Sequence, residues 1–200
     1  MRRDRVRELL EQVAGGALPV DAALDSLAFD PVESLGFASI DHHRALRQGF
    51  PEVIFGSGKT DEQVVAIADR ISQHGDGFLV TRVAATAAEL LQARFPAAEW
   101  NAVGRTVLVR GSAVTPADGM LLIVTAGTSD LPVAEEAAVT ADALGLTVSR
   151  LTDVGVAGIH RVLAQRDTLA SARVIIVVAG MDGALSSVVG GLVRVPVIAV

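Results

Sequence analysis

The chain contains 200 residues, of which 50% are hydrophobic, and it has no cysteine and a formal net charge of -6. This length is enough for a hydrophobic core, and the lack of cysteine excludes disulfides, thiolate metal ligands and a cysteine nucleophile within these residues. The negative charge, the single tryptophan and the absence of tyrosine argue against a nucleic-acid-binding surface, and the apolar runs fall short of the roughly 20 residues that a membrane-spanning helix needs.

The first half of the chain predicts a small α/β unit. Residues 2–14 have apolar side chains at helical spacing and end at two glycines, and a second short helix follows Pro19. Charges recur through the first of these helices, which is unlike a signal peptide, so we expect a cytoplasmic protein. The pattern then predicts strands at 51–55, 77–81 and 105–110, with helices at 60–73 and 84–94.

Two features of this half could carry chemistry. Residues 55–60, FGSGKT, resemble part of a P-loop, but that motif requires a glycine where Val53 stands, so we exclude a Walker-type site. Lys59 still follows a glycine turn and leads into a helix, which makes it a candidate phosphate ligand. His42 and His43 are neighbours that point in different directions, and no further ligand spacing completes a metal site, so we predict that both are solvated.

The second half has a cleaner pattern. Residues 111–119 are rich in turn formers, and we predict a boundary near residue 115 between an N-terminal α/β domain, 1–114, and a second domain, 115–200. Strands predicted at 120–125, 146–151, 173–179 and 195–200 alternate with helices at 132–144, 159–168 and 184–192. This alternation predicts a parallel sheet with right-handed crossovers.

Two strands of this sheet carry further expectations. The sequence VIIVVA, 174–179, is apolar throughout and is typical of a central strand buried on both faces. The last strand, VPVIAV, would put a charged terminal carboxylate on a buried strand. We therefore expect the sequence to be a truncated form that lacks at least one further covering helix.

Ligands of an open parallel sheet bind outside the carboxyl ends of its strands, so the strand-to-helix turns of the second half are the candidate site. The first turn, TAGTSDLPVAEEA, combines a tight turn at Gly127 with Thr128, Ser129 and Asp130 just before a helix. Unpaired N–H groups and hydroxyls at such a place suit a phosphate or a carboxylate. An ordinary helix N-cap is the alternative.

The second turn, DVGVAGIHR, brings Gly158, His160 and Arg161 to the start of a helix. Histidine titrates near neutral pH, so His160 suits proton transfer. A histidine on a surface helix with no role is the alternative, and the position beside the other turns favours a function.

The third turn, AGMDGALSSVVGG, holds Gly180, Met181, Asp182 and Gly183. Glycines let the backbone approach a ligand closely, and Asp182 could act as a base, a metal ligand or a ribose ligand. The small residues that follow, up to Gly190 and Gly191, also permit close helix packing, which is the alternative.

These turns also resemble a known family. The segments GTSDLPVAEEA, DVGVAGIHRVL and AGMDGALSSVVGGLVRVPVIAV look like the motifs of the aminoimidazole ribonucleotide carboxylase and mutase superfamily, the PurE-like fold. The first half adds GFASIDHHRALRQGFPEVIFGSGKT, which those purine enzymes lack and which is similar to the LarB family of pyridinium-3,5-biscarboxylic acid mononucleotide synthases. The resemblance implies a PurE-like three-layer α/β/α parallel sheet over residues 119–200, preceded by a smaller α/β domain.

The LarB resemblance covers nearly the whole chain and implies a carboxylase and hydrolase of nickel-pincer nucleotide biosynthesis. The implied substrates are nicotinic acid adenine dinucleotide and carbon dioxide, supplied as such or as bicarbonate. The pyridinium ring is carboxylated at C5, and phosphoanhydride cleavage releases AMP. The ring is electron-poor, so a nucleophile must add to it first. In the family this nucleophile is a cysteine in the C-terminal region, which the printed sequence ends before reaching.

The same resemblance assigns roles to the turn residues. Asp182, His160 and Asp130 are the expected catalytic residues, with Asp182 or His160 as the base that removes the C5 proton. The expected substrate ligands are the remaining turn residues and the candidate cation: Gly127, Thr128, Ser129, Gly158, Arg161, Gly180, Met181, Gly183 and Lys59. No tightly bound cofactor is expected. Mg²⁺ would assist phosphoanhydride cleavage, but no residue identifies its site. We also expect a homo-oligomer, with the octamer of PurE-like proteins as one form.

Two alternatives stay open. An aminoimidazole ribonucleotide carboxylase or mutase of purine biosynthesis would use the same phosphate turn and His160 without a cysteine nucleophile, although the long first half argues against it. A regulatory module that binds a nucleotide would keep the fold without the chemistry.

Overall fold

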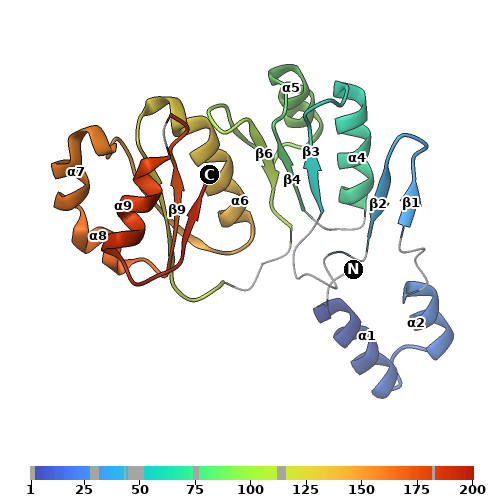
Figure 1. Ribbon diagram of the computed structural model, residues 1–200. Coiled ribbons are helices and arrows are strands. Elements are labelled where there is room, and N and C mark those ends of the chain that lie inside the picture. Colours follow the sequence, from blue (N-terminus) through green and yellow to red (C-terminus); the bar gives the residue numbers. More distant parts are fainter. Residues whose placement is uncertain are drawn as a thin grey trace.

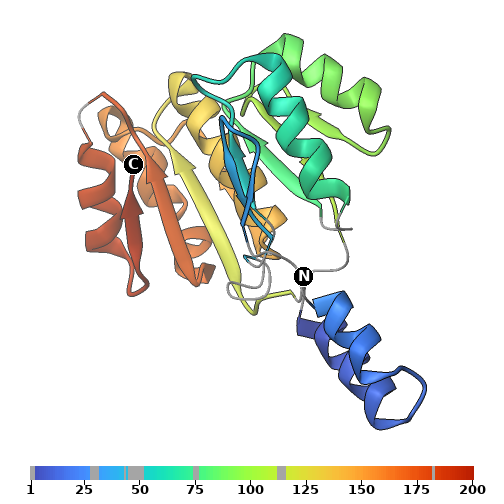
Figure 2. The ribbon, with the colours of Figure 1, turned by 90° about the vertical axis from the view of Figure 1, so that its right-hand side faces the viewer.

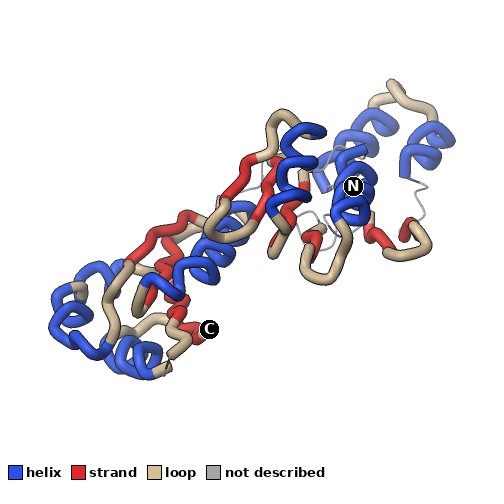
Figure 3. The backbone as a smooth tube through the Cα atoms, turned by 90° about the horizontal axis from the view of Figure 1, so that it is seen from above, coloured by secondary structure: helices blue, strands red, loops and turns tan. Residues whose placement is uncertain are grey.

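The computed structural model describes residues 3–27, 32–42, 44, 52–73, 77–111, 116–181 and 183–200 (Figure 1). Two four-stranded sheets form most of the molecule, one mixed and one entirely parallel. Seen from above, the sheets follow one another along an elongated molecule (Figure 3). The predicted α/β class, with a parallel sheet in the second half and a smaller α/β unit before it, is confirmed, and the sheet of the first unit is mixed. The predicted boundary near residue 115 falls among residues 112–115, which lie outside the described parts.

A helical hairpin begins the described chain and projects from the body (Figures 1 and 2). It consists of α1 (Arg3–Ala14) and α2 (Val20–Leu27), close to the helices that the sequence predicts. Leu9 and Ala23 are its buried side chains. A short antiparallel pair follows, β1 (Val32–Ser34) and β2 (Ser39–Asp41), which the sequence did not predict. No helix in the described ranges combines the length and the apolar character needed to cross a membrane.

The mixed sheet has the strand order β3-β4-β6-β5. Its strands are β3 (Val53–Phe55), β4 (Phe78–Thr81), β5 (Glu99–Asn101) and β6 (Thr106–Val109). Strands β3 and β4 are parallel, whereas β6 is antiparallel to both β4 and β5. Helices α4 (Asp61–Gln73) and α5 (Ala85–Arg94) cover one face, where Phe78, Ile67 and Leu91 share a buried core. The sequence predicted every element here except the three-residue β5.

The parallel sheet has the order β10-β9-β7-β8. Its strands are β7 (Met120–Thr125), β8 (Thr147–Leu151), β9 (Val174–Val178) and β10 (Val197–Ala199). Helix α6 (Leu131–Ala143) covers one face, and α7 (Ile159–Ala164), α8 (Arg166–Ser171) and α9 (Ala184–Leu192) cover the other (Figure 1). Alternate side chains of β7 explain both layers: Leu122 and Val124 pack toward α7 to α9, whereas Leu121 and Ile123 pack against alanines of α6.

Two predictions about this sheet need correction. The single helix expected at 159–168 is two short helices, α7 and α8, which meet at Gln165. Strand β9 is central, as predicted, but Val174 and Ile176 are only half-buried. Their face borders an apolar cavity of about 590 Å³ that runs along α6 and reaches Ile198. These two side chains pack against the α6 alanines only in part, so β7 rather than β9 is the strand buried on both faces.

Helix α6 also contacts the mixed sheet. Arg82 pairs with Glu136, and Asn101 donates to Glu135 at 3.0 Å. A Cβ atom on Gly104 would lie 2.8 Å from the backbone of Glu135, so the turn between β5 and β6 lies directly against the helix. Helix α6 therefore packs between the two sheets, as Figure 1 shows.

Candidate functional site

The candidate site lies at the carboxyl edge of the parallel sheet. The chain passes from β7 to β8 on one side, whereas β9 pairs with β7 on its other side. The direction of winding therefore reverses at β7. In open α/β sheets, the crevice outside such a reversal is the usual place for a ligand. The turn after β7 and the turn after β9 border this crevice.

Asp130 connects these two turns. It ends the short helix η1 (Thr128–Asp130) and is only 8% exposed. Its Oδ2 accepts a hydrogen bond from the Gly127 N–H at 2.9 Å, and its Oδ1 accepts one from the Gly180 N–H at 3.1 Å. Both carboxylate oxygens are thus engaged by backbone donors. This geometry favours a positioning role for Asp130 over the catalytic role expected from the sequence.

The first turn presents its hydroxyls to solvent. Thr128 and Ser129 are exposed, and α6 begins directly after η1, with Pro132 in its first turn. Below them, the Thr125 hydroxyl is buried and has no hydrogen-bond partner among the described residues. The exposed hydroxyls and the helix start can reach a phosphate or carboxylate placed in the crevice.

The second turn lies beside the first. The Val154 N–H donates to the Thr125 carbonyl at 3.1 Å, and a Cβ on Gly155 would lie 3.1 Å from the Ala126 carbonyl oxygen. His160 is exposed in the first turn of α7, where a ligand can reach it. Arg161 pairs with Asp153 at 2.9 Å, next to the buried Gly158. The second turn therefore brings an accessible imidazole to the same edge.

The third turn is the most open of the three. Met181 is 99% exposed, and Gly183 has a left-handed backbone, with φ of 66°. A cavity of about 350 Å³ adjoins this turn, lined by Gly180, Gly183, Ser186 and the ends of β9 and β10. Asp182 lies outside the described residues, so its predicted place beside Ser129 and His160 stays a prediction.

Lys59 lies on the other sheet, in the turn between β3 and α4. Its Nζ donates to the Phe55 carbonyl at 2.8 Å. Thr60 and Gln63 form a reciprocal capping pair, with N···O distances of 3.0 and 3.3 Å, and so begin α4. The local structure thus agrees with a glycine turn leading into a helix.

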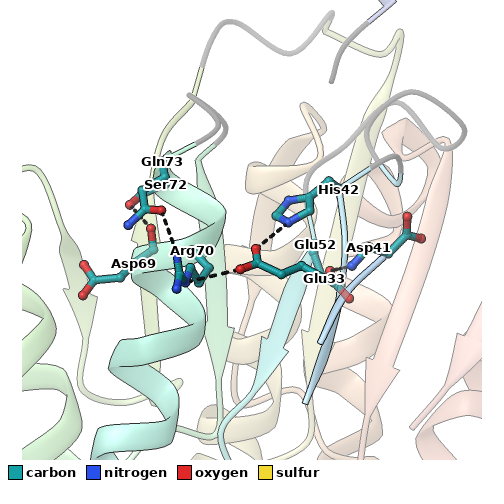
Figure 4. Close-up of polar contacts among 8 residues, drawn as sticks. All are labelled: Glu33, Asp41, His42, Glu52, Asp69, Arg70, Ser72 and Gln73. Atoms are coloured by element: carbon teal, nitrogen blue, oxygen red, sulfur yellow. Dashed lines mark hydrogen bonds and ion pairs between the residues drawn. The ribbon is translucent and has the colours of Figure 1, made fainter. Parts of the chain in front are cut away.

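A polar cluster near β1 and β2 was missed by the sequence analysis (Figure 4). Glu33 lies 3.0 Å from His42 Nε2 and 3.4 Å from Arg70 Nε. The His42 side chain is only 7% exposed, so the prediction that it is solvated is wrong, while His43 lies outside the described residues. The cluster connects β1 to α4, and its members are too far apart in sequence for spacing to reveal it. Within the described parts, no group of three or more His, Asp or Glu side chains could hold a metal ion.

Comparison with known proteins identifies relatives of both halves. Residues 32–111, which include the mixed sheet and the Glu33 cluster, match the LarB/PurE-like N-terminal domain. The chain is also 31% identical over 208 aligned residues to the uncharacterized protein MJ0165 of Methanocaldococcus jannaschii. This alignment covers 98% of the chain and 80% of the relative.

Proposed function

The chain belongs to the LarB/PurE-like family, and on this premise we propose that it carboxylates the pyridinium ring of nicotinic acid adenine dinucleotide and releases AMP. The observation that carries the proposal is the winding reversal of the parallel sheet at β7, where Asp130 holds the turns after β7 and β9 together. Residues 32–111 match the LarB/PurE-like N-terminal domain, and we favour this reaction over purine carboxylation because the purine enzymes are expected to lack this first half.

The turn after β7 binds the phosphate of the nicotinate half in this proposal. Thr128 and Ser129 present exposed hydroxyls immediately before α6, and these hydroxyls are the donors that we assign to the phosphate, since Pro132 has no N–H and the Leu131 N–H donates to the Thr128 carbonyl. Asp130 positions these donors, because it holds Gly127 and Gly180 at fixed distances. The glycines of the third turn then allow the backbone to lie close to the ring.

The carboxylation needs a nucleophile, an electrophile and a base. A nucleophile adds to the electron-poor ring and makes an enamine, whose C5 attacks carbon dioxide and forms the new carbon–carbon bond. A base then removes the C5 proton, and loss of the nucleophile restores the aromatic ring. We assign the base to His160, which is exposed at the start of α7, or to Asp182, which follows β9 in the sequence. The sequence contains no cysteine, so the proposal assigns the nucleophile to no residue of this chain.

The second reaction is hydrolysis of the phosphoanhydride. Water attacks one phosphorus atom and the other phosphate leaves, which gives the mononucleotide and AMP. A bound Mg²⁺ ion would neutralise the charge that develops there. No described residue group identifies a site for it, and Asp130 has both oxygens engaged, so no step of the proposal depends on a metal ligand from this chain.

Self-association is part of the proposal. Ser187, Gly190 and Gly191 are exposed at helical spacing on α9, and a Cβ on either glycine would contact nothing within 4 Å. A face with so little bulk allows another helix to approach closely. Light scattering of the complete protein at micromolar concentration tests this, and a monomer there contradicts it.

Product analysis tests the reaction. The complete protein is incubated with nicotinic acid adenine dinucleotide, ¹³C-bicarbonate and Mg²⁺, and the products are separated by mass spectrometry. A labelled dicarboxylated mononucleotide together with AMP supports the proposal. Conversion of aminoimidazole ribonucleotide instead would identify a purine enzyme, and tight nucleotide binding without turnover of either substrate would identify a regulatory module.

A further inference from the structure

The helical hairpin of α1 and α2 stands apart from the rest of the described chain. It projects from the body, and its side chains belong to none of the buried clusters that stabilise the two sheets (Figures 1 and 2). Its helices have 12 and 8 residues. Helices this short are marginal in water unless an apolar face packs against another element. Leu9 and Ala23, the buried side chains of the hairpin, provide little of that packing.

The apolar stripe on each helix is wider than the contact between the two helices. Leu10 follows Leu9, and Leu24 follows Ala23, so each leucine lies about 100° further around its helix than the buried residue. The helices run in opposite directions (Figure 2), and the same rotation therefore carries both leucines to one side of the hairpin. Val20, three residues before Ala23, lies about 60° around in the same sense and joins them on this side.

This side of the hairpin is open to solvent. Leu10, Val20 and Leu24 are 57%, 59% and 56% exposed. Helical spacing from Leu9 places two half-buried valines, Val6 and Val13, on the same side. We call these five side chains the open face. A pair of antiparallel helices with one open apolar face is half of a four-helix bundle, which is complete when a second such pair covers that face.

We propose that the open face binds the open face of a second copy of this chain, so that two hairpins form a four-helix bundle. In the arrangement that we assign, each α1 packs against the α2 of the partner, and all neighbouring helices run antiparallel. Leu10 and Leu24 lie at the same height in the hairpin, since each follows the residue at which the helices meet. Leu10 of one copy therefore lies opposite Leu24 of its partner.

The charges beside the open face support this arrangement. Arg7 lies about 60° beyond Leu10 on α1, at the rim of the face, and it is exposed. Helix α2 carries Asp21 and Asp25 and no basic residue. None of these three side chains has an ion pair within the described parts of the chain. Packing α1 against the partner's α2 brings Arg7 toward Asp25, whereas packing α2 against α2 would bring like charges together.

The mass of the particle in solution tests the contact. Light scattering over a range of micromolar concentrations measures this mass for the protein and for the double variant Leu10→Gln/Leu24→Gln. The variant places amides in the bundle core, so the dissociation constant should rise by about 10-fold or more, and the mass should fall toward half at low concentration. Leu90→Gln on α5 is the matched control, because Leu90 is also about half exposed, and it should leave the mass unchanged. An unchanged mass in the double variant, or an equal fall in the control, would overturn the proposal.

Cross-linking tests the same contact without polar substitutions in the hairpin. The chain contains no cysteine, so a single introduced cysteine reports its own contacts. A mixture of Leu10→Cys and Leu24→Cys should form a disulfide-linked dimer on mild oxidation, because the two positions face each other across the bundle. Leu90→Cys measures linking by random collision. A mixture that links no faster than Leu90→Cys would overturn the proposal, and equal linking of Leu10→Cys alone would overturn the packing of α1 against α2.

The hairpin contact is separate from the association proposed for α9. Helix α9 covers the parallel sheet, whereas the hairpin projects from the body (Figure 1). If the glutamine variant keeps an assembly of half the mass, the hairpin contact is supported and another surface holds the remaining copies together. The inference also stands independently of the proposed reaction, since the hairpin contributes no residue to the candidate site.

Discussion

Gly180 donates its N–H to Asp130 Oδ1 at 3.1 Å across 50 residues of sequence. The other oxygen of the same carboxylate accepts from Gly127 at 2.9 Å. One buried side chain therefore sets the spacing of the two turns that border the crevice. Any ligand that contacts both turns depends on this carboxylate without touching it.

Asp130→Ala should lower the free energy of unfolding by about 2–4 kcal/mol, because two bonds to a charged acceptor are lost and backbone donors lose their partners. Asp130→Asn should lower the free energy of unfolding by roughly half as much. Its amide oxygen can still accept one of the two hydrogen bonds, whereas its NH₂ group cannot accept the other. Urea unfolding measures the change in free energy for both variants. Ser129→Ala, at an exposed position, is the control and should change this free energy by close to zero. A loss below about 0.5 kcal/mol for Asp130→Ala would show that the contacts do not order the turns.

The contacts of Glu135 on α6, chiefly the one with Arg150 on β8, should depend on acid pH. Hydrogen bonds from Arg150 chiefly lower the pKa of Glu135, with a further contribution from Asn101, while burial opposes them. Since the folded pKa lies below the ordinary value of 4.5, the stabilisation is present above that pH and is lost as the pH falls through the folded pKa. Unfolding free energies at pH about 6 and about 3 should therefore differ less in Glu135→Gln than in the wild type. Equal differences in the two proteins would contradict this assignment.

Gly104→Ala should destabilise the protein by about 1–3 kcal/mol. The added Cβ would meet the backbone of Glu135 and Glu136 at 2.8 Å, and neither a helix backbone nor the turn can give way without opening the contact between the sheets. Ala102→Ser, an exposed change in the same turn, is the control. Thermal unfolding of both variants checks the prediction, and similar midpoints would count against a tight contact at Gly104.

Asp182→Asn should leave substrate affinity nearly unchanged in the complete enzyme, since amide and carboxylate have almost the same shape. If Asp182 is the base for the C5 proton, single-turnover carboxylation should slow by roughly two to four orders of magnitude. Asp167→Asn, an exposed change on α8, serves as the control. Turnover near the wild-type rate in Asp182→Asn would move the role of base elsewhere.

His160→Asn should weaken binding and slow the reaction together if the imidazole holds a substrate phosphate or carboxylate. His160 is exposed at the start of α7, so the substitution should not change the free energy of unfolding by more than about 0.5 kcal/mol. Calorimetry and single-turnover rates separate the two effects. A slower rate with full affinity would instead make His160 the acid or base.

The sequence by itself determined the parallel sheet and its turns. Periodicity identified the strands and helices of residues 120–200 to within a few positions, except that the helix expected at 159–168 is two, because each long element must bury one face. The rule that ligands bind at carboxyl ends then selected the turns that hold Ser129, His160 and Gly180. It did not identify β1, β2 or β5, whose three residues are too few to show a period.

Tertiary structure decided what several side chains do. From the sequence alone, Asp130 is expected to be a free acid at a helix start. Only the tertiary structure, which brings the turn after β9 close to it, shows that it accepts a hydrogen bond from the Gly180 N–H. His42 is buried against Glu33 because β1 folds beside β2. Helix α6 is joined to the mixed sheet by Arg82 and Glu136, which lie 54 positions apart in the sequence. Such contacts arise from packing between elements, so they cannot be predicted from the local sequence.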